Sequence, residues 1–102
     1  MPSKKYKIWL DERTFMVVEL AMIKGGVVSF VVRLMYLEAG REFNIARYDT
    51  AHGAPHRDSL GRRHGLLRKE WYLDLPMDVV LQRAIMDFRL NYESYIAQFR
   101  EN

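Results

Sequence analysis

Hydrophobic and polar positions alternate through the first half of the chain, which is the pattern of antiparallel strands. Runs rich in β-branched and aromatic residues predict strands over residues 5–10, 14–23, 27–37 and 41–49. The segment Lys24-Gly25-Gly26 predicts a hairpin with a three-residue loop, and Ala39-Gly40 predicts a two-residue loop. With these loops, the inner face of the second and third strands holds Met16, Val18, Leu20, Met22, Val28, Phe30, Val32, Leu34 and Tyr36.

The end of the fourth strand breaks this apolar pattern. Phe43 and Ile45 continue the inner face, and by strict alternation Arg47 and Asp49 come next on it, whereas Tyr48 points outward. A charged side chain on a covered face needs a partner or a function. We therefore expect either a polar rim around the core or the floor of a site where this strand ends, and we prefer the site.

A helical pattern appears only at the end of the chain. Residues 50–69 predict a loop rich in histidine and arginine, and residues 70–74 a short fifth strand. Pro76 suits the first turn of a helix that runs to about residue 100. Large side chains recur in this helix every three or four residues, at Leu81, Ile85, Phe88, Tyr92, Tyr95 and Phe99.

These elements predict a single α+β domain over residues 1–102: an antiparallel sheet of four to five strands, supplied by residues 1–49 and the short strand, with one long C-terminal helix (residues 76–100) packed on one face. No helix remains to cover the other face. That face would hold Phe15, Val17, Ala21, Ile23, Val27, Val31, Met35 and Leu37. Because monomers rarely expose so large an apolar patch, we expect a homodimer in which two sheets face each other, with Glu19 and Arg33 at or near the interface.

Composition narrows the choice of chemistry. The chain has 102 residues, a net charge of +3 and no cysteine, so disulfides and thiolate chemistry are excluded. No apolar run approaches the roughly 20 residues that a membrane span requires, and we expect a cytoplasmic protein without membrane contact. The basic excess is local: residues 57–69 contain one acid, Asp58, against Arg57, Arg62, Arg63, Arg68 and Lys69.

The same region holds the residues that carry the preferred hypothesis, an RNA-directed protein that cleaves its substrate without a cofactor. His52 and His56 form an acid–base pair for a phosphodiester, because imidazole titrates near neutral pH. Asp49 or Asp58 would orient an imidazole. The predicted nucleic-acid contacts are Arg47, Arg57, Arg62, Arg63, Arg68 and Lys69, and Trp71 and Tyr72 suit base stacking.

Other interpretations of these residues stay open. His52, His56 and Asp58, with His64 as a fourth ligand, would form the metal centre of a small metal-dependent enzyme. A non-enzymatic dimeric module would use the same loop to bind a protein or a nucleic acid. A solvated loop without function accounts equally for the polar composition. There is no Gly-rich phosphate loop, HExxH motif or GxSxG elbow to favour other enzyme classes.

The residues Tyr48-Asp49, His52-Gly53 and Pro55-His56-Arg57-Asp58 resemble a motif of small prokaryotic proteins grouped with TumE-type toxins of toxin–antitoxin pairs. The resemblance extends in layout from about residue 41 to residue 99. It implies a few strands followed by an aromatic-rich C-terminal helix, ribonuclease activity at the histidines and arginines, and a cognate antitoxin as protein partner. Asp58 stands where a further histidine is usual in that family.

Overall fold

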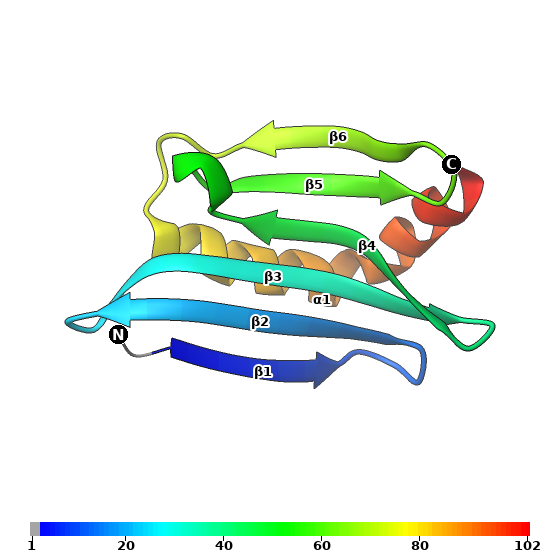
Figure 1. Ribbon diagram of the computed structural model, residues 1–102, viewed down its shortest axis with the longest axis horizontal. Coiled ribbons are helices and arrows are strands. Elements are labelled where there is room, and N and C mark those ends of the chain that lie inside the picture. The colour runs from blue at the N-terminus through cyan, green and yellow to red at the C-terminus, as the bar shows by residue number, and fades with distance from the viewer. Residues whose placement is uncertain (1–2) are drawn as a thin grey trace.

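The computed structural model describes residues 3–102, which form one antiparallel sheet and one long helix (Figure 1). The six strands are β1 (Ser3–Trp9), β2 (Thr14–Ile23), β3 (Gly26–Glu38), β4 (Arg41–Asp49), β5 (His56–Gly61) and β6 (Gly65–Trp71). Each strand pairs with the next one in the sequence, so the sheet is a meander. The α+β class is confirmed, and the number of strands is six rather than four to five.

The additional strand comes from the segment for which a loop was expected. Residues 50–69 hold only a short 3₁₀ helix, η1 (Ala51–Gly53), before the hairpin of β5 and β6 begins. The first four residues of β5 are polar on both faces of the strand, so no hydrophobic alternation marked it as a strand. The predicted strand over residues 70–74 is also displaced, because β6 ends at Trp71.

The hairpin of β2 and β3 has the predicted register along most of its length, but its turn differs from the predicted one. Its turn has two residues, Lys24 and Gly25, with φ angles of 51° and 81°, instead of three. An unpaired residue in β3, Val28, restores the register, and Val18 pairs with Val32 as the inner-face pattern requires. The bulge also reverses the predicted faces of the first two valines of β3: Val27 packs against the core, and Val28 is exposed.

A second bulge reverses the faces of the end of β4. Leu34 pairs with Ala46 and Met35 with Asn44, so Ile45 has no partner on β3. One extra residue moves every following side chain to the opposite face. Tyr48 is therefore buried on the helix side, and the predictions that Arg47 and Asp49 lie on the covered face and Tyr48 outside are wrong.

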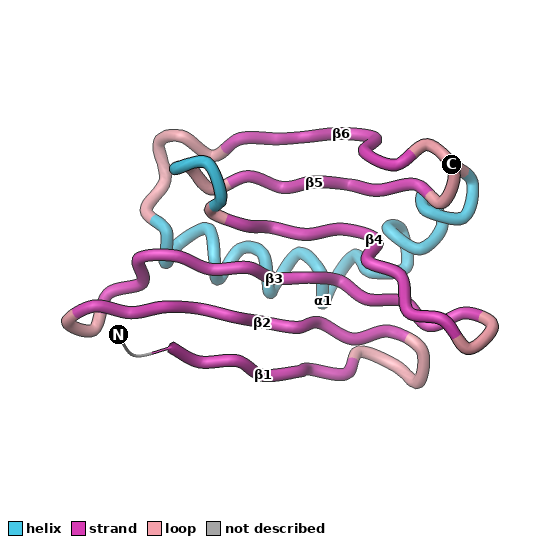
Figure 2. Tube along the Cα trace, viewed as in Figure 1, coloured by secondary structure: helices cyan, strands magenta, loops and turns pink. Residues whose placement is uncertain are grey.

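Helix α1 (Met77–Glu101) lies along one face of the sheet, behind β3 and β4 in the view of Figure 2. The predicted stripe is confirmed, since its members are buried or packed against the core. Gly61 allows the helix end to dock: a Cβ there would lie 2.8 Å from the backbone oxygen of Asn102. Within residues 3–102, no helix is both long and apolar enough to cross a membrane.

The face without a helix is less apolar than the sequence indicated. Phe15 is 2% exposed because the Trp9 ring packs on it at 4.8 Å between centroids. A row of ion pairs crosses the same face, with Glu19 held by Lys5 at 3.1 Å and by Arg33 at 3.0 Å. We call this surface the open face. A homodimer through it stays a prediction.

Candidate functional site on the open face

Three neighbouring strands present one group of titratable side chains on the open face. The strand register places Asp49 opposite His56 and Arg47 opposite Asp58. On the other side of β5, Lys69 pairs with Asp58. Side chains opposite each other on one face of a sheet lie about 5 Å apart, so the register alone brings these groups together. We call Asp49, His56 and Asp58 the His–Asp cluster.

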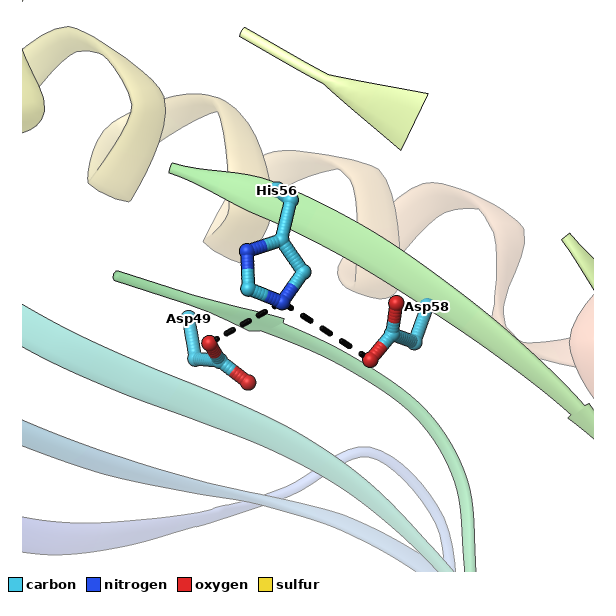
Figure 3. A group of neighbouring side chains, drawn as sticks. All are labelled: Asp49, His56 and Asp58. Carbon is cyan, nitrogen blue, oxygen red and sulfur yellow. Dashed lines mark ion pairs between the residues drawn. The ribbon is translucent and has the colours of Figure 1, made fainter. Parts of the chain in front are cut away.

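The imidazole of His56 lies between the two carboxylates (Figure 3). Its Nε2 atom is 3.1 Å from Oδ1 of Asp49 and 3.8 Å from Oδ2 of Asp58. Its Nδ1 atom is 3.2 Å from the backbone oxygen of Ala54. Both ring nitrogens therefore face acceptors, and a neutral imidazole carries only one N–H. The arrangement calls for a proton or another cation at the second nitrogen.

Two basic side chains flank the His–Asp cluster. The Nε atom of Arg47 lies 3.0 Å from Asp58 Oδ2 and 3.6 Å from Asp49 Oδ2. The Nζ atom of Lys69 lies 3.5 Å from the other oxygen of Asp58. Arg47 and Lys69 thus offset the formal charges of the two aspartates. Both cations keep about a third or more of their side chains exposed, so they also face any ligand on this surface.

The carboxylates differ in how fully they are satisfied. Asp49 Oδ1 accepts a hydrogen bond from the backbone N–H of Ala51, at 2.9 Å, which ties η1 to the end of β4. Asp58 is 1% exposed, and its Oδ1 accepts no hydrogen bond from the part of the chain that the structure describes. A buried carboxylate oxygen without a donor is costly. Asp58 therefore has unused capacity to bind a cation or a donor.

An aromatic ring forms the edge of the site. Trp71 pairs with His56 across β5 and β6, and the two rings lie 4.7 Å apart at an angle of 44°. The indole is 44% exposed, and Lys69 Nζ is 5.5 Å from its centre. The site thus combines buried titratable groups with an exposed stacking surface and two cations.

Two of the six predicted nucleic-acid-binding residues, Arg47 and Lys69, lie at the His–Asp cluster. Arg57 points to the helix side, where it pairs with Glu70. The others are dispersed over the hairpin of β5 and β6: Arg62 pairs with Glu38, Arg63 is exposed in the turn, and Arg68 pairs with Glu70. Alternation along β5 and β6 separates residues that are neighbours in the sequence. The six do not form one phosphate site.

The three histidines do not meet either. His64 lies in the turn at the far end of β5 from His56, where its backbone N–H donates to the oxygen of Asn102. It cannot be the fourth ligand of a metal bound at His56. The side chain of His52 lies outside the described part of the structure, although its backbone belongs to η1. The His52/His56 pair therefore stays a prediction.

Sequence reasoning missed a second polar network on the helix side of the same strands. The hydroxyls of Tyr48 and Tyr95 both donate to Oδ2 of Asp87, at 2.6 and 2.5 Å. Arg57 donates to the Tyr95 oxygen at 2.9 Å and to Glu70 at 2.8 Å. We call these residues the tyrosine network. Burial and then the hydrogen bond to Asp87 raise the pKa of Tyr48 and of Tyr95.

The sequence carried only a weak signal of this network. Asp87 lies four residues after Arg83 on the helix, which suggested an exposed ion pair without function. The alternation of β4 placed Tyr48 outside. Only the bulge at Ile45 brings that hydroxyl to the helix. The spacing of aromatic residues along the helix did indicate that Tyr95 faces the sheet.

The protein is thus a small α+β protein with a six-stranded meander, one helix on one face of the sheet and a His–Asp cluster on the other. The family model for a domain of unknown function, DUF7718, matches residues 1–102, and the chain belongs to this family. Neither the curated proteins nor the solved structures compared with it include a significant match.

Proposed function

We propose that this protein acts on single-stranded RNA, which it binds across the open face and cleaves beside the His–Asp cluster, as an endoribonuclease of the toxin type. One observation carries the proposal. The buried titratable groups, two flanking cations and an exposed tryptophan lie together on the one face of the sheet that the helix leaves uncovered. Proteins that bind single strands combine a basic track with aromatic stacking surfaces in this way.

The open face extends this binding surface beyond the cluster. Arg33 pairs with Arg47 across β3 and β4, so two arginines stand on the open face in the middle of the sheet, one directed to Glu19 on β2 and the other to Asp58 on β5. A shallow groove of about 540 Å³ continues from there to β1, with Lys7 and Arg33 among its lining residues. Trp9, at the end of β1, is 53% exposed. A single-stranded RNA that lies across the sheet would meet aromatic rings on which its bases can stack and cations for its phosphates.

RNA can be cleaved by its own ribose 2′-hydroxyl, and the enzyme then has to transfer two protons and offset negative charge. The ribose 2′-oxygen forms a bond to phosphorus, the bond to the 5′-oxygen breaks, one proton leaves the 2′-hydroxyl and another reaches the 5′-oxygen. Negative charge grows on the phosphate oxygens as this occurs. Arg47 and Lys69 are the cations that would offset it, and the His–Asp cluster supplies the groups for proton transfer.

The experiment is binding and cleavage of labelled single-stranded RNA by the purified protein and three variants. We expect His56→Gln to lose cleavage while binding remains, Lys69→Ala to weaken binding, and Arg89→Ala, an exposed arginine on α1, to leave both unchanged. Thermal unfolding of each variant tests whether it is folded. Wild-type protein that neither binds nor cleaves, or His56→Gln that cleaves normally, would overturn the proposal.

A second candidate is a dimeric module that binds without catalysis. Exposed apolar side chains on the open face favour it, Ile23 at 47% exposure and the partly exposed Val17 and Met35 among them. A dimer through this face would cover the RNA surface, so the two functions exclude each other there. Sedimentation of the free protein at several concentrations distinguishes them. A cognate antitoxin as partner stays a prediction of the resemblance.

A further inference from the structure

Three donor atoms of the types that bind transition metals converge in the His–Asp cluster. One atom each of Asp49, His56 and Asp58 lie within 4.8 Å of one another, and all three residues are buried. We propose that this cluster binds one divalent transition metal ion, with Mn²⁺ and Zn²⁺ as the fitting chemistry, because one imidazole and two carboxylates suit both ions. Asp49 here takes the place that His52 and His64 have in the metal site considered from the sequence.

The hydrogen bond on the far side of the imidazole supports this. The backbone oxygen of Ala54 lies 3.2 Å from Nδ1 of His56 and is positioned to accept a proton from it. In metal-binding histidines, the N–H of the second ring nitrogen commonly donates a hydrogen bond to a backbone carbonyl, which fixes the tautomer. In that tautomer the Nε2 lone pair faces Asp49 and Asp58. Without a positive charge between them, these acceptors repel one another.

A second observation is independent of the imidazole. Asp58 is 1% exposed, and its Oδ1 has no hydrogen-bond donor within the described residues. Of the two cations beside Asp58, Arg47 lies 3.0 Å from the other oxygen, Oδ2, and Lys69 lies 3.5 Å from Oδ1. A carboxylate buried with an unsatisfied oxygen is more stable when a cation coordinates it. The unused capacity of Asp58 thus adds to the case for a metal ion.

Arg47 is the competitor for this position. Its Nε atom is near one oxygen of Asp58 and one of Asp49, so the guanidinium compensates the same two carboxylates that a metal ion would bind. The side chain is 39% exposed and has room to rotate toward solvent. Binding of an ion and this contact of Arg47 are therefore mutually exclusive. The released guanidinium would remain on the open face.

The inference deepens the proposed function and rests on it only for the role of the ion. Beside a bound phosphodiester, a divalent cation would offset negative charge and lower the pKa of a bound water, which would then take over the proton transfer from the coordinated His56. Binding of the ion itself needs no RNA, so the two proposals fail separately. Metal binding without cleavage removes the proposed function alone, and cleavage that resists a chelator removes the role of the ion.

The experiment is calorimetric titration of metal-free protein with MnCl₂ and with ZnCl₂, together with Mn²⁺ spectra by electron paramagnetic resonance. We expect one site per chain and a rise in Tm with ion concentration. Asp58→Asn should weaken binding by about 100-fold. Arg47→Gln should strengthen it by about tenfold, since a competing charge is removed a few ångströms away. An increase in affinity cannot result from a loss of folding.

The control is Arg33→Gln. Arg33 is also an arginine of the open face, directly opposite Arg47, but its partner is Glu19 and it does not contact the cluster. Its affinity for the ion should equal that of the wild type. If Asp58→Asn does not fold, Asp49→Asn replaces it. Any of three results overturns the proposal: no binding at about 1 mM ion, equal affinities of the wild type and the aspartate variant, or an Arg47→Gln affinity no higher than that of Arg33→Gln.

Discussion

The two polar groups on opposite faces of β4, β5 and β6 differ in how hydrogen-bond donors and acceptors are matched at their centres. At the centre of the tyrosine network, two hydroxyls donate to one oxygen of Asp87, and Arg57 donates to Tyr95 and Glu70. The buried Nε atom of Arg57 has no hydrogen-bond partner among the described residues. In the His–Asp cluster, one imidazole nitrogen faces two carboxylates, and one oxygen of Asp58 accepts no hydrogen bond within the described chain.

This difference separates a network that holds the fold from one that awaits a ligand. Helix α1 supplies Asp87 and Tyr95 to the first, so their hydrogen bonds with Tyr48 and Arg57 join the helix to the sheet. The second lies on the face without a helix and keeps two cations partly exposed. Buried like charges gathered around one titratable side chain are typical of sites that act on something else.

The largest effect that tests this comparison is expected at Tyr48. Its ring is 1% exposed and lies 5.2 Å from Phe88 and 5.9 Å from Tyr72. Tyr48→Ala should lower the free energy of unfolding by about 3–5 kcal/mol, because it removes a buried aromatic ring and leaves a cavity. Urea denaturation measures this. A loss under about 1 kcal/mol would mean that Tyr48 faces outward and that β4 has no bulge.

The next effect concerns the ligand and not the fold. Trp71→Ala should lower the affinity for single-stranded RNA by about 1–3 kcal/mol, the range measured for loss of one stacked base. Fluorescence anisotropy of a labelled oligonucleotide measures it. Leu90→Ala is the matched control, because Leu90 is a 72% exposed apolar residue on α1. Equal RNA affinities of the two variants would mean that the RNA does not bind on the open face.

The prediction of the fold from sequence succeeded where one period was uninterrupted. The spacing of Leu81, Phe88, Tyr95 and Phe99 defined both the length of the helix and its buried side, because nothing breaks the 3.6-residue repeat there. The predicted register was also correct in the middle of the hairpin of β2 and β3. Apolar residues at alternate positions of β2 and β3 allow one register only, since a slip by one residue would expose the core.

The prediction failed where a single extra residue changed the face of a strand. The bulge at Ile45 has no signature in the sequence, yet it exchanges the faces of Tyr48 and Arg47. Asp49, His56 and Asp58 were named as candidates from residue types alone. That they meet depends on the pairing of β4 with β5, and β5 was not predicted because its first four side chains are polar on both faces.

A smaller effect is expected from the tyrosine hydroxyls, and it depends on pH. Tyr95→Phe should cost about 1–2 kcal/mol at neutral pH, because it removes a hydrogen bond to the charged Asp87. Burial and Asp87 raise the pKa of Tyr95 above its usual 10.0. The unfolded chain therefore loses this proton first, and the contribution of the tyrosine is complete below pH 10 and declines as the pH rises above it.

Urea denaturation from pH 8 to pH 11 measures that decline. The slope of stability against pH above 10 should be smaller for Tyr95→Phe than for the wild type, by up to about 1.4 kcal/mol per pH unit for one proton. The difference between the two proteins then narrows as pH increases. Parallel curves would show that the hydroxyl titrates alike in both states, which contradicts its burial in the tyrosine network.

The smallest effect on stability is expected from a charge of the open face. Arg33→Ala removes the 3.0 Å pair with Glu19, a partly exposed contact that should contribute less than about 1 kcal/mol and less still in high salt. The same variant should weaken RNA binding and reduce the slope of log affinity against log salt by about 0.7, the value for one phosphate of a single strand. Titrations at several salt concentrations measure both, with Arg89→Ala as control. If Arg33→Ala instead destabilised the fold as much as Tyr95→Phe does, the open face would be a structural network like the one beneath the helix.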